Sequence, residues 1–146
     1  MRSTPCVGIC STTYGDLVCR GCKRFSHEIV AWNVYTEDQR ERVWSRLYSL
    51  RDQATAVFVA VSDEQMLRDA ALAARIELPA SASALTLGYE LLRRKARDLH
   101  SVTEVGLVAV DPNRAAPIVV RNAIDTEFQV RSVAYFERSF HTPVDS

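Results

Sequence analysis

The spacing of apolar residues predicts a series of amphipathic helices in the middle of the chain. Ser26 precedes the segment HEIVAW as an N-cap residue, and residues 36–39 (TEDQ) have the form of a capping box. Beyond that box, apolar residues recur at helical spacing and charged residues occupy the opposite face. We expect Ser62 to cap another helix over residues 63–76. Residues 81–99 predict a further helix with a broad apolar face.

Other segments lack this helical period. Residues 54–62 (ATAVFVAVS) fit either the end of a helix or a buried strand, and their β-branched and aromatic content slightly favours a strand. Residues 106–110 (GLVAV) and 116–120 (APIVV) flank a turn sequence and predict two strands. Residues 127–140 alternate imperfectly and predict a third strand. Residues 1–25 show no period and are too short to bury a core, so something besides packing must order them.

Composition and charge limit the class of protein. The 146 residues are 47% hydrophobic and 25% charged, as in a soluble globular protein, and the net charge is zero. A general nucleic-acid binder needs an excess of positive charge, so this class is disfavoured. No apolar run reaches the ~20 residues that span a membrane, and the first ten residues lack the apolar segment of a secretory signal. We therefore expect a cytoplasmic protein with reduced thiols and no membrane contact.

The four cysteines lie within 17 positions, with the spacing Cys6-x3-Cys10-x8-Cys19-x2-Cys22. Clustered cysteines in a reducing compartment bind metal more often than they form disulfides. Two close pairs joined by a short loop can bring four thiolates around one point. Such a set suits tetrahedral zinc, and it suits a [4Fe–4S] or [2Fe–2S] cluster equally well. The sequence therefore predicts a metal centre on these four residues.

The neighbours of the cysteines fit a metal centre. Gly8 lies between the first pair and Gly21 between the second, where tight turns and N–H···S contacts are usual in metal sites. Lys23 and Arg24 would offset the negative charge of a thiolate-bound centre. His27 is an alternative ligand, although a surface histidine at the start of a helix is the favoured interpretation.

Three other interpretations of the cysteines are weaker. Inert core cysteines do not cluster in this way, and disulfides are disfavoured in a reducing compartment. A thioredoxin-type redox pair would need a strand before Cys19, and none is predicted there.

The segments PCVGIC and CRGCKRFSHEIVAW resemble the short bacterial family DUF1289, whose members are described as predicted iron–sulfur proteins. The matching positions are Pro5, Cys6, Gly8, Cys10, Cys19, Gly21, Cys22, Arg24, Glu28, Ile29 and Trp32. The resemblance covers about residues 5–47. Members often have Gly-Arg-Thr after the last cysteine, whereas this chain has Lys23-Arg24-Phe25, a departure that leaves the ligands untouched. The resemblance implies an iron–sulfur cluster on the four cysteines.

Few other residues suggest chemistry. A basic run could contact RNA or a phosphate, but such a run is usually a solvated helix face; its members are Arg93, Arg94, Lys95 and Arg97. His100 and His141 have no carboxylate or cysteine nearby in a catalytic pattern. The aromatic residues near the capping box are expected to be core residues, with a partner surface as the alternative; they are Phe25, Trp32, Tyr35 and Trp44. The chain contains no recognisable enzyme motif.

Together these patterns predict an α+β protein, in which an irregular four-cysteine metal module is followed by amphipathic helices and a small C-terminal antiparallel sheet. We expect residues 1–52 to form the module with its helical extension, and residues 53–146 to form an α+β domain. The leading hypothesis is an iron–sulfur protein with a redox, sensing or accessory role beside a protein partner. The alternatives are a structural zinc module in a protein–protein or protein–RNA adaptor, and an enzyme whose active site lies in the C-terminal domain.

Overall fold

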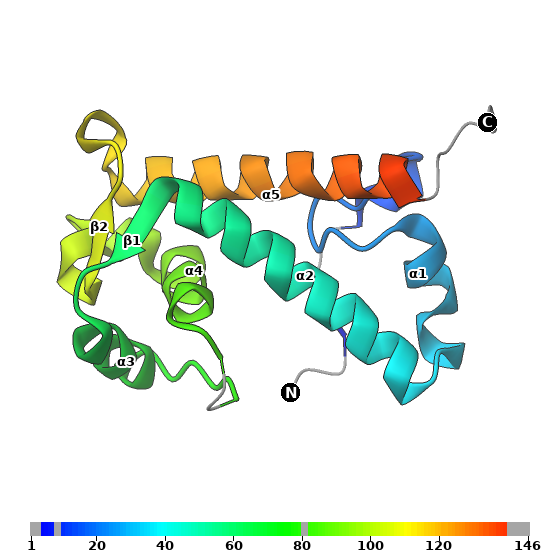
Figure 1. Cartoon of the computed structure of the whole chain (residues 1–146), viewed down its shortest axis with the longest axis horizontal. Coiled ribbons are helices and arrows are strands. Elements are labelled where there is room, and N and C mark those ends of the chain that lie inside the picture. The colour runs from blue at the N-terminus through cyan, green and yellow to red at the C-terminus, as the bar shows by residue number, and fades with distance from the viewer. Residues whose placement is uncertain (1–3, 8–9, 80–81, 140–146) are drawn as a thin grey trace. The chain divides into compact units, whose positions relative to one another are not determined.

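A computed structural model describes residues 4–7, 10–79 and 82–139, and it is mostly helical with a small antiparallel sheet (Figure 1). This confirms the predicted α+β class. The helices are α1 (Ser26–Ala31), α2 (Glu37–Phe58), α3 (Glu64–Ala73), α4 (Ala84–Lys95) and α5 (Pro117–Ser139). The strands are β1 (Val59–Val61) and β2 (Leu107–Ala109). The 3₁₀ turns are Ser11–Tyr14, Trp32–Val34, Ala96–Asp98, Val102–Val105 and Pro112–Arg114.

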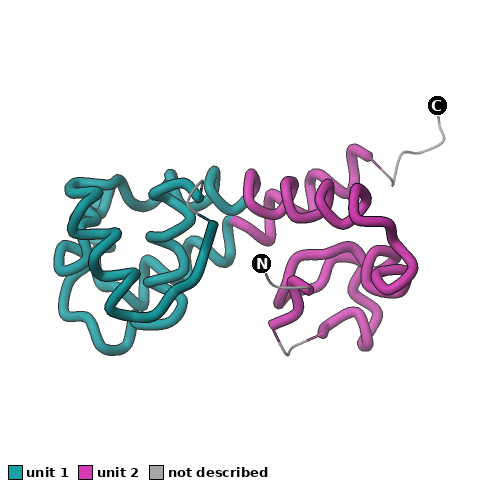
Figure 2. Tube along the Cα trace, turned by 90° about the horizontal axis from the view of Figure 1, so that it is seen from below, with its two compact units in different colours: residues 1, 51–127 teal, residues 2–50, 128–146 magenta. Residues whose placement is uncertain are grey.

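The chain divides into two compact units (Figure 2). Residues 2–50 and 128–146 make up one, here called the cysteine unit, and residues 51–127 make up nearly all of the other, the central unit. The long helices α2 and α5 contribute residues to both units. The predicted domain division into residues 1–52 and 53–146 stays a prediction.

The central unit contains the sheet. β1 pairs antiparallel with β2, with Val59 opposite Ala109 and Val61 opposite Leu107. Helices α3 and α4 pack together beside it, and α4 approaches β2 so closely that a Cβ on Gly88 would lie 3.2 Å from the Leu107 side chain. The large apolar side chains buried at 2% exposure or less in this unit are Val59, Leu67, Leu91, Leu92, Val102, Leu107, Val120 and Ile124.

Two of the three predicted C-terminal strands are wrong. Residues 116–120 and 127–140 fall largely within α5, which begins at Pro117. Proline suits the first helical position, because its missing N–H has no partner there and its φ is already helical. The residues of α5 buried at 5% exposure or less are Val120, Ile124, Phe128 and Ser132, which follow a helical period of four.

The structure decides the ambiguous segment and corrects one helix cap. Residues 54–58 end α2, and β1 follows at once over Val59–Val61. The predicted cap Ser62 is wrong: Asp63 caps α3, and its Oδ1 accepts a hydrogen bond from the Met66 N–H at 3.0 Å. Both side chains have an oxygen suited to capping, so the one-residue choice depends on backbone geometry.

The core of the cysteine unit is aromatic. Phe25 is fully buried and stands edge-on to Phe136 of α5, with ring centroids 5.0 Å apart, and lies 6.2 Å from Tyr135. Trp32 and Trp44 are 6% and 9% exposed, so the aromatic residues near the capping box are mainly core residues, as expected. The capping box itself is also confirmed, because the N–H and side-chain oxygen of Thr36 both bond to Gln39.

Candidate metal centre

Cys19 and Cys22 lie in a tight hairpin turn of the cysteine unit. Val18 and Phe25 form an antiparallel bridge at the base of this hairpin. Inside it, the Cys19 N–H donates to the Arg24 carbonyl at 2.9 Å, and the Lys23 N–H donates to the Cys19 carbonyl at 2.9 Å. Lys23 adopts a left-handed conformation with φ of 68°, which lets the chain turn back after Cys22. We call residues 18–25 the knuckle.

Backbone N–H groups surround the sulfur of Cys19. Burial alone would raise the pKa of this thiol, but backbone hydrogen bonds from Cys22, Ser11 and Gly21, together with the Cys22 side chain, lower its pKa to about 7. N–H donors favour the thiolate because they stabilise its negative charge. Gly21 thus donates one of these backbone contacts, and its role beside a bound metal stays a prediction. Since the side chains of Cys19 and Cys22 also bond to each other, the two sulfurs lie side by side.

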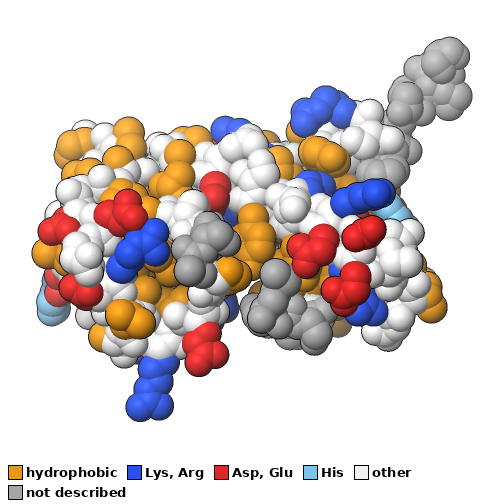
Figure 3. Space-filling view, turned by 60° about the horizontal axis from the view of Figure 1, so that its bottom comes forward, with side chains coloured by type: hydrophobic (Ala, Val, Ile, Leu, Met, Phe, Trp, Pro, Cys, Tyr) orange, Lys and Arg blue, Asp and Glu red, His pale blue; other side chains and the backbone are white. Residues whose placement is uncertain are grey.

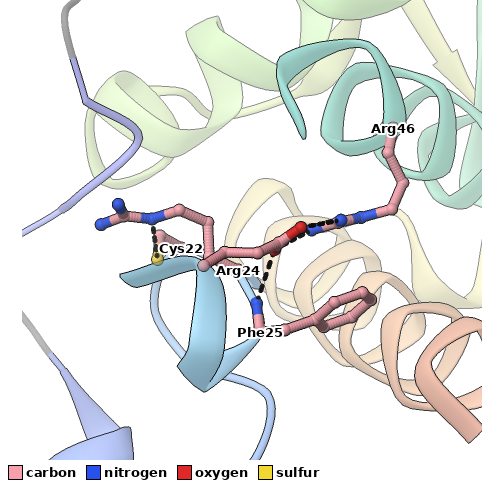
Figure 4. A network of polar contacts seen from close by, with 5 residues as sticks. Cys22, Arg24, Phe25 and Arg46 are labelled. Carbon is pink, nitrogen blue, oxygen red and sulfur yellow. Dashed lines mark hydrogen bonds and ion pairs between the residues drawn. The ribbon is translucent and has the colours of Figure 1, made fainter. Parts of the chain in front are cut away.

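Arg24 is fixed against the sulfur of Cys22. Its Nε donates to Cys22 Sγ at 3.3 Å (Figure 4), and its guanidinium lies 4.9 Å from the Trp32 ring centroid. Burial raises the pKa of Cys22, and the hydrogen bonds and charge of Arg24 partly oppose that rise. Arg24 therefore places positive charge next to a cysteine sulfur, while its role in offsetting the charge of a metal centre stays a prediction.

Lys23 is almost fully buried, with 1% of its surface exposed. Its Nζ donates to the Arg20 carbonyl within the knuckle and lies 5.7 Å from the Phe128 ring centroid. The ammonium is therefore held by the knuckle backbone and by an aromatic face of α5. The predicted second positive charge is thus part of the knuckle itself.

The segment carrying the first two cysteines contacts the knuckle through Ser11. The hydroxyl of Ser11 accepts a hydrogen bond from the Arg20 N–H at 2.8 Å, and its backbone bonds to the sulfur of Cys19. Cys10 immediately precedes this residue, is partly buried, and bonds to the Thr12 hydroxyl at 2.9 Å. Two hydrogen bonds of one serine thus hold the backbone beside Cys10 against the knuckle.

The structure brings together two of the four predicted ligands. Cys6 is exposed, and within the described ranges no group of three or more His, Cys, Asp and Glu side chains is arranged to hold a metal. His27 is exposed on α1, as expected for a surface histidine. Gly8 lies outside the described residues. The role of the four cysteines as a complete ligand set stays a prediction.

Sequence reasoning missed the part played by Ser11 and by Arg46. Arg46 of α2 lies 3.9 Å from the Phe25 ring centroid and forms an ion pair with Glu28 of α1. These residues come from segments far apart in the sequence, so no local period links them. The sequence signal that could have pointed to this ion pair was Glu28, which is one of the positions that resemble DUF1289.

The basic run lies at the end of α4. Arg94, Lys95 and Arg97 are exposed, whereas Arg93 pairs with Glu90 at 3.2 Å. Cations near a helix C-terminus are stabilised by the helix dipole, which accounts for the run without a ligand. On the face in Figure 3, acidic and basic side chains are interspersed. A nucleic-acid partner for this run stays the disfavoured alternative that it is from the sequence.

Two further expectations from the sequence concern membrane contact and two histidines. None of the described helices combines the length and the apolar character needed to cross a membrane. His100 is exposed, and its backbone N–H donates a hydrogen bond to the Glu104 carboxylate. His141 lies outside the described residues.

The fold and the knuckle define an α+β protein with a cysteine-bearing hairpin near its N-terminus. Residues 4–51 match the model of a family described as "Protein of unknown function (DUF1289)". The predicted resemblance is therefore confirmed for this segment only. No curated protein and no solved structure matches the chain.

Proposed function

We propose that this protein carries a metal centre on Cys6, Cys10, Cys19 and Cys22, and that the centre is an iron–sulfur cluster. The main support is the knuckle, in which two sulfurs lie together and backbone N–H groups bond to one of them. Thiolates, not thiols, are the ligands of metals. A backbone that lowers the pKa of Cys19 to about 7 favours the ligating form near neutral pH.

The charges around the knuckle support the same proposal. Lys23 and Arg24 are 1% and 4% exposed, so two cationic side chains are buried within two residues of Cys22. Burying a cation is costly unless a negative charge lies nearby. Four thiolates carry more negative charge than the net positive charge of a zinc ion or of an iron–sulfide core, so such an anionic centre would stabilise both cations.

Metal binding would have to close the first cysteine segment onto the knuckle. Cys10 is already beside the knuckle through Ser11, while Cys6 is exposed. Because metal binding and folding are coupled in small metal modules, the metal would order this segment. This coupling agrees with a segment that has too few apolar residues to form a core.

An iron–sulfur cluster supplies one-electron redox chemistry when it is bound. The sequence contains no enzyme motif, so we propose an accessory role, in which the protein carries electrons to or senses redox state for a protein partner. A structural zinc ion would use the same four ligands. It would make the module a clip that stabilises the N-terminal segment.

Purification without oxygen tests the proposal. We expect brown protein, with iron and acid-labile sulfide bound to each chain. If the protein is colourless and binds one zinc per chain, the centre is a structural zinc ion and not an iron–sulfur cluster. Protein that binds neither metal, even after reconstitution with iron and sulfide or with zinc, would contradict the metal centre.

Variants identify the ligands. Cys19→Ser should lower the bound metal per chain, whereas His27→Ala, which removes the alternative ligand, should leave it unchanged. Removing the metal with a chelator should speed amide hydrogen exchange in the cysteine segment and leave the central unit protected. An unchanged metal content in Cys19→Ser would rule out the proposed ligand set.

A further inference from the structure

A second candidate site on the cysteine unit adjoins the knuckle through Arg24, whose Nε contacts Cys22 Sγ. It is a pocket of about 350 Å³ lined by Thr4, Arg24, Ile29, Trp32, Asn33 and Arg40. Two of these residues are arginines, and none of them is acidic. The pocket volume falls in the range of small-molecule sites.

Arg24 lines this pocket. Among the described residues, the one hydrogen bond of this guanidinium runs from Nε to Cys22 Sγ, and no carboxylate pairs with it. Figure 4 shows its two terminal nitrogens pointing away from the sulfur. With 4% of its surface exposed, Arg24 is a buried cation whose terminal N–H donors lack a described acceptor.

Arg40 is held on the same indole from the start of α2. Its Nε donates to the Trp32 carbonyl at 3.0 Å and its Nη2 donates to the Asn33 carbonyl at 3.3 Å. Its guanidinium lies 5.7 Å from the Trp32 ring centroid, while that of Arg24 lies 4.9 Å from it. The acceptors of Arg40 are neutral carbonyls. They fix the position of the guanidinium without neutralising its positive charge.

Two fixed positive charges around one ring repel each other, and an anion between them would remove that repulsion. A guanidinium binds phosphate oxygens with two parallel N–H donors, and two guanidiniums match the charge of a dianion. Thr4 and Asn33 add neutral donors to the lining. We propose that this pocket binds the phosphate group of a small phosphorylated molecule.

The pocket exceeds the size of inorganic phosphate, which is why we assign an organic phosphate. The guanidiniums lie against the indole, so the ring itself is not free to stack on a base. The proposal goes beyond the metal centre, and phosphate binding here needs no metal.

Isothermal titration calorimetry of the full chain tests this site. The probes are glycerol 3-phosphate, inorganic phosphate, succinate as a dicarboxylate, and sodium chloride at matched ionic strength. We expect saturable binding of glycerol 3-phosphate, weaker binding of inorganic phosphate, and no saturable heat from chloride. Arg40→Gln should weaken glycerol 3-phosphate binding roughly tenfold or more, because it removes a charge-assisted contact.

Arg42→Gln is the matched control, since it removes the same charge from an exposed position on the same helix. It should leave the affinity unchanged. If both variants lost the same affinity for glycerol 3-phosphate, the net charge of the protein would explain the loss, and the proposed site would be wrong. Absence of saturable phosphate binding, or equal affinity for succinate, would also overturn the phosphate assignment. Because Arg40 is not a proposed ligand, the metal content of Arg40→Gln should match that of the wild type, which separates the two proposals.

Discussion

Glu28 and Arg46 form a two-pronged ion pair inside the cysteine unit. Arg46 Nη1 lies 2.5 Å from Glu28 Oε2, and Nη2 lies 2.7 Å from Oε1, with side-chain exposures of 10% and 6% (Figure 4). The same carboxylate accepts a hydrogen bond from the Phe25 N–H at 2.9 Å. One carboxylate therefore connects the end of the knuckle, the first turn of α1 and the middle of α2.

Glu28→Ala should destabilise the cysteine unit by about 3–5 kcal/mol, because it leaves the buried charge of Arg46 without its partner. Chemical denaturation followed by tryptophan fluorescence measures this loss, since both tryptophans belong to the same unit. The exposed Glu41→Ala on α2 is the control and should change stability by less than about 0.5 kcal/mol. Equal effects of the two substitutions would mean that water reaches the pair.

Asp63→Ala should cost about 1 kcal/mol of unfolding free energy, because it removes the acceptor for the Met66 N–H at the start of α3. Ser62→Ala, one residue earlier, should have little effect, since its side chain is exposed and does not cap the helix. Thermal or urea unfolding compares the two variants. If Ser62→Ala lowered the unfolding free energy more than Asp63→Ala, Ser62 would be the helix cap, as the sequence predicted.

Gly106→Ala should destabilise the central unit by about 3 kcal/mol. The glycine has φ of 82°, and a Cβ there would collide with the carbonyl oxygen of Asp63. Gly15→Ala shares a positive φ, at 99°, but its Cβ would meet nothing within 4 Å. It should therefore cost only about 1–2 kcal/mol for the left-handed backbone. Urea midpoints of the two variants test whether the collision adds to the backbone cost.

Metal-free protein should gain stability as the pH rises from about 7 to 9. The pKa of Cys19 is about 7 in the fold against an ordinary value of 9.0, so the folded state loses its proton first. The gain is complete above the ordinary value and is lost as the pH falls through 7. Burial raises the pKa of Cys22, which opposes the gain at the upper end of this range.

Two measurements check this pH dependence. The Cβ chemical shift of Cys19 should titrate near pH 7, and urea midpoints of the metal-free chain should rise over the same interval. Cys19→Ser should flatten the rise. A Cys19 shift that titrates near 9 would contradict the N–H···S contacts of the knuckle.

Local sequence patterns were enough to predict several elements. The capping box at Thr36 and the helical spacing after it predict α2, because both signals lie within a few residues of each other. Helix α5 was missed, since Ile118, Val119 and Val120 are β-branched and resemble a strand. Burial at every fourth position overrode that preference, and only the tertiary structure reveals which positions are buried.

The candidate site was predictable only in part. The spacing of the cysteines and the charges of Lys23 and Arg24 are local, so the sequence alone suggested a metal centre there, which stays a prediction. From α2, Arg40 contacts Trp32 and Arg46 pairs with Glu28, so their roles depend on how α2 packs against these earlier segments. No short pattern encodes such a contact between distant segments.

The aromatic contact between Phe25 and Phe136 joins an early segment of the chain to a late one. A ribosome makes the knuckle first and adds its aromatic partner on α5 only after the intervening residues 26–135. Until α5 is made, the cysteine segment therefore lacks its full aromatic core. Loading of the proposed metal and oxidation of the thiols would compete during that interval, which ends when α5 is made.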